Sequence, residues 1–109
     1  MPNYSRNDIL LVQYPFSDLS AAKVRPAVVV SVPYPSQDNF IVPLTSRLHN
    51  LMPGEFALQD WGKAGLNVPS AAKRGIYTIH SDLVIKLVGR LSARDAEALQ
   101  NSLRGWLGL

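Results

Sequence analysis

The sequence of 109 residues contains no cysteine. Disulfide bonds, a thiol nucleophile and zinc–thiolate sites are therefore excluded. Long apolar runs are missing as well, because the first sixteen residues, MPNYSRNDILLVQYPF, contain an apolar run of only four, ILLV. A secretion signal or a membrane-spanning helix needs a much longer run. We therefore expect an unexported protein of the cytoplasm that has no membrane partner.

Familiar catalytic and metal-binding motifs are also absent. The two histidines, His49 and His80, have no partners at the spacing of metal ligands, so we expect neither a metal site nor a cofactor. The sequence has no glycine-rich phosphate loop, no G-x-S-x-G elbow and no close pair of carboxylates. Metal-free chemistry and simple binding remain as the possible classes of function.

The composition is that of a folded protein. Apolar residues make up 47% of the chain and charged residues 17%. A chain of this length can build one modest core, which predicts a single domain over residues 1–109. Eleven lysines and arginines against eight acids give a net charge of +3. This mild excess favours a polyanionic partner such as nucleic acid, although many unrelated proteins share it.

Short apolar runs alternate with turn-forming residues as far as about residue 91. The runs that we interpret as strands are 8–14, 25–32, 40–48, 55–61, 71–79 and 82–91. Many short strands at this spacing predict a small barrel or sandwich. The second run is apolar nearly throughout, as expected for a strand that is covered on both faces or closed into a barrel. Pro43 cannot donate a ladder hydrogen bond, so we expect the third run to be an edge strand or to bulge there.

The apolar period changes to that of a helix in the last segment, which predicts an amphipathic helix at about 92–107. Its apolar stripe, which we expect to pack onto the barrel, consists of Ala96, Leu99, Leu103, Trp106 and Leu107. Ser92 and Asp95 have the spacing of a capping box at the start. We expect Gly105 to cost about 1 kcal/mol and to fray the last turn.

Arg25 is the most informative charged residue. Pro26 restricts the residue before it to extended geometry, so the guanidinium leaves the backbone in a defined direction. A guanidinium can hold phosphate oxygens in a two-pronged fork. Thr45 and Ser46 end the third run with hydroxyls on opposite sides of a strand, and one of them can face Arg25 if the two strands pair.

A structural interpretation of the same residues is also open. Arg25 could form an ion pair with Asp8 or Asp18, and Thr45 and Ser46 could simply be residues that favour a strand end. Residue chemistry alone leaves both interpretations standing.

Four segments together resemble the MazF/PemK family of type II toxin–antitoxin toxins. They are NDILLVQYPFSDLSAAKVRPAVVVS, VPLTS, GLNVPSAA and VGRLSARDAEALQNSLRGWLGL. The resemblance covers roughly residues 7–109, and its most specific part is DILLVQYPFSDLSAAKVRPAVVVS together with PLTS. It implies a mainly β fold, with an SH3-like barrel at about 7–91 and a C-terminal helix. It also implies a homodimer, a cognate antitoxin and metal-independent cleavage of single-stranded RNA.

The resemblance also assigns roles to residues. The catalytic arginine and threonine of the family fall on Arg25 and Thr45. Cleavage would begin with attack of a 2′-OH on its own phosphate, with Arg25 stabilising the negative charge of the transition state and Thr45 donating a hydrogen bond or positioning the phosphate. Arginine stays protonated and is a poor base, so no residue is assigned as the proton acceptor. The candidate RNA-binding residues are Asp18, Lys23, Ser46, Arg47, Lys73 and Arg74.

Two positions depart from the family pattern. Asn7 stands where a glycine is usual, a small change because asparagine tolerates the left-handed region. Some PemK-like members carry an arginine and an aspartate in the stretch that reads AAKRG here, and this stretch has no acid. Lys73 and Arg74 could bind phosphate or form a solvated pair. Asp18 is the nearest acid in sequence to Arg25, and it could equally be a turn residue.

Two other functions remain alternatives. CcdB-type toxins are thought to share this barrel and to poison DNA gyrase by binding alone, through a tryptophan-containing C-terminus, and this sequence ends in GWLGL. A non-catalytic SH3-like adaptor is the other alternative. The segments KVRP and PLTS favour the ribonuclease.

Overall fold

The computed structural model describes residues 3–14 and 23–109. Within these ranges the chain forms seven strands, a short 3₁₀ turn and a C-terminal helix, which confirms the predicted mainly β fold. The elements are β1 (Asp8–Tyr14), β2 (Lys23–Val29), β3 (Asp38–Thr45), β4 (Phe56–Ala57), β5 (Ala71–Ala72), β6 (Tyr77–His80), η1 (Ser81–Leu83), β7 (Val84–Arg90) and α1 (Ala93–Leu107). The predicted strands 55–61 and 71–79 are therefore too long, since the first shrinks to β4 and the second divides into β5 and β6.

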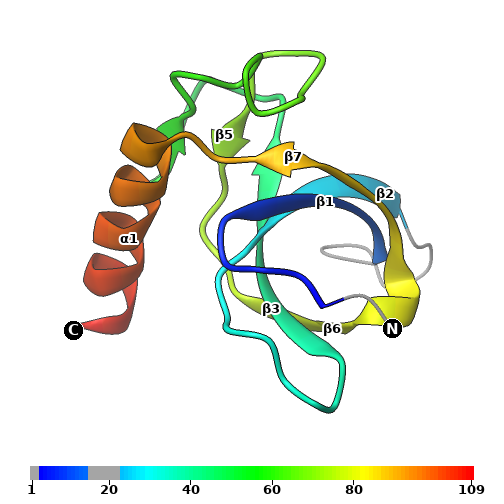
Figure 1. Ribbon diagram of the computed structural model, residues 1–109. Coiled ribbons are helices and arrows are strands. Elements are labelled where there is room, and N and C mark those ends of the chain that lie inside the picture. The colour runs from blue at the N-terminus through cyan, green and yellow to red at the C-terminus, as the bar shows by residue number, and fades with distance from the viewer. Residues whose placement is uncertain (1–2, 15–22) are drawn as a thin grey trace.

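The sheet is antiparallel and strongly curved (Figure 1). β2 lies between β1 and β3, β7 pairs with the other edge of β1, and β3 pairs on its far side with both β6 and β5. Over the described part of the chain no ladder joins β7 back to β6 or β4, so the barrel is partly open. α1 packs against the outside of the sheet (Figure 1).

Both faces of the central strands are buried. In β2, Val28 belongs to the core between the sheet and α1, whereas Ala27 and Val29 belong to the core inside the barrel. Side chains alternate across a strand, so two cores on either side of one sheet require an unbroken apolar run. This confirms the expectation for the part of the run 25–32 that lies in β2, whereas the strand ends at Val29 and Val32 is 58% exposed.

The prediction for Pro43 is wrong, because β3 is an interior strand with a regular register against β2. The carbonyl oxygen of Pro43 accepts from the N–H of Lys73 at 2.9 Å, so the Pro43 nitrogen also faces that side of the strand. Pairing with β6 ends at Ile41, and pairing with β5 begins at Leu44. The missing N–H thus falls in a break between two partner strands, where it costs no ladder hydrogen bond.

Asn7 adopts φ +78°, so the position uses the left-handed region that asparagine tolerates. Its N–H donates to the carbonyl of Val29 at 2.8 Å, and its carbonyl accepts from Leu91 at 3.0 Å. The turn before β1 therefore ties the end of β2 to the end of β7.

Most of the predicted apolar stripe of α1 packs on the sheet, with Leu99 and Leu103 buried, but Leu107 is wrongly included because it is 55% exposed. Ser92 is the N-cap, and its hydroxyl accepts from the N–H of Asp95 at 3.3 Å. The reciprocal half of a capping box is wrong, because the buried Asp95 carboxylate instead accepts from the N–H groups of Gln59 and Asp60, each at 2.9 Å. Asp95 therefore fastens the helix to the segment that follows β4.

The last turn of α1 does not fray at Gly105. The helix continues to Leu107 and ends at Gly108, which adopts φ +71°. The N–H groups of Gly108 and Leu109 both donate to the carbonyl of Arg104, which is a regular C-terminal cap. No helix in the described ranges is both long and apolar enough to cross a membrane.

Candidate active-site groove

Arg25 and Thr45 meet because β2 and β3 pair. The register joins Ala27 to Pro43 and Val28 to Val42, and its continuation places Arg25 opposite Thr45. Strand alternation puts both side chains on the face that carries the inner core, at the end where that core stops. Both residues are half-buried. The pairing that the sequence left conditional is therefore present.

Arg25 and Thr45 both line one cavity of about 330 Å³. Its lining consists of Val24, Arg25, Pro26, Leu44, Thr45, Ser46, Arg47, Val68 and Ser70. Ser46 lies just beyond the end of β3, where strand alternation no longer applies. It lines the same cavity as Thr45. Two arginines and three hydroxyl-bearing residues are in this lining, and residues of these types suit an anionic, hydrogen-bonding ligand such as a phosphodiester.

The hydroxyl of Thr45 has a defined orientation. Its Oγ1 accepts from the N–H of Arg47 at 3.1 Å. A hydroxyl has one proton to donate, and this contact occupies only an acceptor position. The Thr45 proton can therefore be donated to a ligand in the cavity.

The alternative in which Arg25 forms a structural ion pair with Asp8 or Asp18 loses the first of these partners. Asp8 accepts from Nη1 of Arg90 at 2.7 Å and so is already paired across β1 and β7. The other partner, Asp18, lies outside the described residues. Among the residues that are described, no carboxylate lies within ion-pair distance of Arg25.

A second cavity, of about 280 Å³, adjoins the first at Thr45 and Arg47. It shares Thr45 and Arg47 with the Arg25 cavity, and its full lining consists of Thr45, Arg47, His49, Asn50, Leu51, Met52, Glu55 and Lys73. We call the two together the Thr45 groove and the second one the Glu55 pocket. Thr45 thus lies at the middle of a groove whose two ends differ in chemistry.

Glu55 is held in place by backbone donors. Its Oε1 accepts from the N–H of Met52 at 2.7 Å, and its Oε2 accepts from the N–H of Arg74 at 2.8 Å. Burial would raise the pKa of Glu55, but these two hydrogen bonds and the charges of Lys73 and Arg74 outweigh it and hold the pKa below its ordinary value. The carboxylate is therefore charged at neutral pH. It also places an acid beside the stretch 71–75, which has none of its own.

The structure separates the candidate RNA-binding residues. Ser46, Arg47 and Lys73 line the Thr45 groove, so of the pair at 73–74 it is the lysine that reaches the site. Lys23 and Arg74 are exposed and line neither cavity.

Sequence reasoning missed several residues that line the groove, namely His49, Asn50, Glu55, Val68 and Ser70. They come from loops or from the two sides of a turn, and no periodic pattern connects them to Arg25 or Thr45. Asp18 falls outside the described residues.

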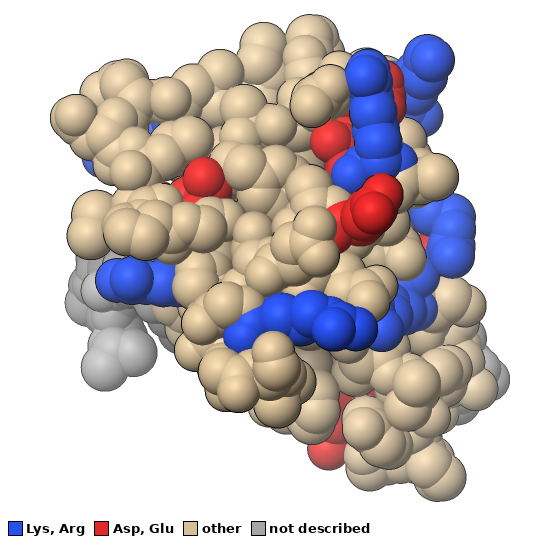
Figure 2. Space-filling model, turned by 90° about the vertical axis from the view of Figure 1, so that its left-hand side faces the viewer, with Lys and Arg blue, Asp and Glu red and all other residues tan. Residues whose placement is uncertain are grey.

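Basic side chains are spread over one face of the molecule (Figure 2). On the face that carries α1, basic side chains lie at several separate places, some of them beside acidic ones (Figure 2). Within residues 3–14 and 23–109, no three His, Asp or Glu side chains gather as a metal-binding group. The groove is therefore identified by its two cavities and by the residues that line them.

The curved antiparallel sheet with a C-terminal helix is the fold that the resemblance to MazF-like toxins implied. Residues 5–107 match the family described as PemK-like, MazF-like toxin of type II toxin–antitoxin system, and the chain belongs to this family. No curated protein matches the sequence closely enough to count as a relative.

Solved structures share the fold at low sequence identity. An endoribonuclease in complex with its cognate antitoxin, from mycobacterial species, superposes with a TM-score of 0.78 at 17% identity over 97% of this chain and 96% of its own. An endoribonuclease from mycobacterial species gives 0.77 at 20% identity over 100% and 95%. The Mycobacterium tuberculosis toxin MazF-mt6 gives 0.72 at 19% identity over 94% and 97%. The expected fold is confirmed.

Proposed function

We propose that this toxin is an endoribonuclease that cleaves single-stranded RNA in the Thr45 groove, without a metal cofactor. The observation that carries the proposal is the convergence of Arg25 and Thr45, from paired strands, on one cavity. Two of the structures that share the fold are endoribonucleases, which supports the same chemistry here.

The reaction follows from the side chains of the cavity. The ribose 2′-OH attacks the adjacent phosphorus, its proton leaves to a base, and the bond to the 5′-oxygen of the next nucleotide breaks as that oxygen takes up a proton. Negative charge gathers on the non-bridging oxygens in the transition state, where a preorganised guanidinium stabilises it. Arg25 has this role, and the O–H of Thr45 donates to the same phosphate. Because arginine stays protonated, Arg25 acts as an electrostatic group.

We also propose the partners and the compartment. A cognate antitoxin would cover the Thr45 groove with an acidic or amphipathic segment that folds on binding, and inhibition would then be competitive with RNA. One of the structures that share the fold is bound to its cognate antitoxin. The toxin would act in the cytoplasm as a homodimer.

The tryptophan-containing C-terminus offers no support for gyrase poisoning. Trp106 is half-buried against the core, and its Nε1 donates to the carbonyl of Pro53 at 3.0 Å. Its ring also fills the space beside Gly54. The tryptophan thus has a structural role in fastening the end of α1.

The decisive test is the substitution Arg25→Ala. We expect single-turnover cleavage of one defined RNA to fall about 10²- to 10³-fold, the usual loss of one preorganised donor. Arg25→Lys should recover little, because a point charge lacks the planar fork. Wild-type cleavage should persist in EDTA and disappear when the cleaved nucleotide is 2′-deoxy, since its nucleophile is gone.

Arg104→Ala, at an exposed position of α1, is the matched control and should cleave at the wild-type rate. Circular dichroism reports the fold of each variant. A near wild-type rate for Arg25→Ala, or cutting of the 2′-deoxy substrate, would contradict the mechanism. A gyrase supercoiling assay in parallel detects the alternative function.

A further inference from the structure

The Glu55 pocket adjoins the catalytic end of the groove directly. It shares Thr45 and Arg47 with the Arg25 cavity. A polynucleotide whose phosphate lies between Arg25 and Thr45 has a neighbouring nucleotide within reach of this pocket, because adjacent nucleotides are covalently joined. With about 280 Å³, the pocket has room for one base.

Glu55 gives this pocket a fixed pair of acceptors. Each carboxylate oxygen has two lone pairs, and the backbone donors at Met52 and Arg74 use one on each oxygen. The carboxylate thus keeps one acceptor position on both oxygens. Its charge is secured because the pKa of Glu55 lies below its ordinary value.

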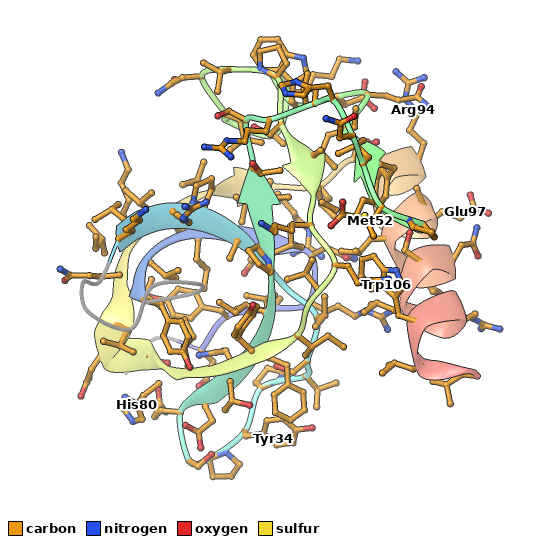
Figure 3. All side chains as sticks on the ribbon, turned by 180° about the vertical axis from the view of Figure 1, so that it is seen from behind. Tyr34, Met52, His80, Arg94, Glu97 and Trp106 are labelled. Atoms are coloured by element: carbon orange, nitrogen blue, oxygen red, sulfur yellow. The ribbon has the colours of Figure 1, made fainter. Side chains whose placement is uncertain are left out.

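The other walls suit a nucleotide. Leu51 and Met52 offer an apolar surface for a flat ring, and Met52 lies beside α1 near Trp106 (Figure 3). Arg47 and Lys73 add two cations that can neutralise the phosphates on either side of the base. The apolar walls suit the faces of a base, the carboxylate suits hydrogen-bond donors on its edge, and the cations suit the adjoining phosphates.

We propose that the Glu55 pocket binds a guanine base next to the cleaved phosphate, so that Glu55 determines sequence specificity. Guanine presents two adjacent donors, N1–H and the 2-amino group, which match the two oxygens of a carboxylate. Adenine and cytosine place an acceptor beside their amino group, and uracil places its single donor between two carbonyls. These acceptors would face a fixed negative charge, and a buried group without its partner discriminates strongly. The inference rests on the proposed cleavage of RNA.

The test varies the base. Cleavage sites in a mixed RNA are mapped first, and the nucleotide on each side of the cleaved bond is then changed in turn to guanine, inosine, adenine, cytosine or uracil. We expect guanine to be preferred on one side by about 100-fold over adenine, and inosine, which lacks the 2-amino group, to lose about 10-fold. Fluorescence anisotropy with the same oligonucleotides made 2′-deoxy at the cleaved position measures the preference without cleavage.

The variant Glu55→Gln should reduce the preference for guanine over adenine to within about 3-fold. A purely structural role for Glu55 would lower cleavage of every oligonucleotide alike and leave this ratio unchanged. Glu97→Gln is the matched control, since Glu97 is exposed and points away from the sheet on α1 (Figure 3). If circular dichroism shows that Glu55→Gln does not fold, the comparison of guanine with inosine on the wild-type protein still tests the inference.

The outcomes separate the two proposals. Cleavage with no preference for guanine on either side overturns the Glu55 inference alone, as does an unchanged ratio in folded Glu55→Gln. Binding that prefers guanine, without any cleavage, overturns the ribonuclease proposal and supports the pocket. Neither binding nor cleavage of any oligonucleotide overturns both.

Discussion

At the scale of single residues, the site depends on side chains whose backbone holds them in place. Thr45 lies at the end of β3, and its oxygen accepts from the N–H of Arg47. This bond fixes the hydroxyl and also fixes the start of the segment that carries Arg47 into both cavities. One threonine therefore aligns a donor and a cation together.

The substitution Thr45→Ala should slow single-turnover cleavage by about 10- to 100-fold, less than Arg25→Ala, because it removes one neutral hydrogen bond. Thr45→Ser keeps the hydroxyl and should retain most of the rate. Thr78→Ala, at an exposed position of β6, serves as the control for loss of a strand threonine. An unchanged rate for Thr45→Ala would remove this residue from the mechanism.

At the scale of elements, hydrogen bonds near both ends of α1 join the helix to the segment 54–60. Near its start Arg94 donates twice to Asp60, at 2.7 and 2.8 Å, and Asp95 holds the backbone of the same segment. The side-chain hydrogen bonds that Asp60 accepts from Arg94 and from Ser92 keep the pKa of Asp60 well below its ordinary value. Near its end Ser102 donates to the carbonyl of Gly54. The helix therefore fixes both ends of the segment that carries Glu55.

The substitution Asp95→Asn should lower the free energy of unfolding by about 2 kcal/mol. An amide oxygen can accept from one of the two backbone N–H groups, but its NH₂ group then faces the other and leaves a buried donor unsatisfied. Urea denaturation monitored by circular dichroism gives the value, and Glu97→Gln on the exposed face of α1 should change it by less than about 0.5 kcal/mol. Equal stability of Asp95→Asn would show that the contact is replaceable.

At the scale of the whole molecule, apolar surface remains exposed beside the groove. Val24, Val68 and Leu87 are 51%, 50% and 55% exposed. A further cavity of about 320 Å³ includes Val68 and Leu87, and it shares Pro26, Val68 and Ser70 with the Arg25 cavity. A second copy of the chain could cover this surface, since closed homodimers are the commonest assembly of small proteins.

Light scattering at micromolar concentration should therefore give twice the monomer mass. Leu87→Glu should shift the protein toward monomer, because a charge would enter an apolar interface. Leu109→Glu, at a terminal side chain that is 85% exposed, is the matched control and should stay dimeric. A monomer mass for the wild-type protein would exclude the dimer.

The amino-acid sequence determined the elements that have a strong period, and it predicted that Thr45 or Ser46 could face Arg25 if their two strands paired. The runs at 8–14, 25–32 and 40–48 became β1, β2 and β3, and the helical stripe became α1. The register of β2 against β3 then placed Thr45 opposite Arg25, because residues of antiparallel neighbours face each other in a simple order once two strands pair.

Only the tertiary structure decided the position of Pro43 inside the sheet, the partners of Asp95 and the arrival of Glu55 in the groove. Each depends on contacts between segments far apart in the chain. Asp95 reaches back to Gln59 and Asp60, and Glu55 meets the backbone of Arg74 beside the pair formed by β4 and β5. Hydrophobic periodicity describes which face of an element is buried, but it carries no information about which distant backbone N–H a carboxylate will meet.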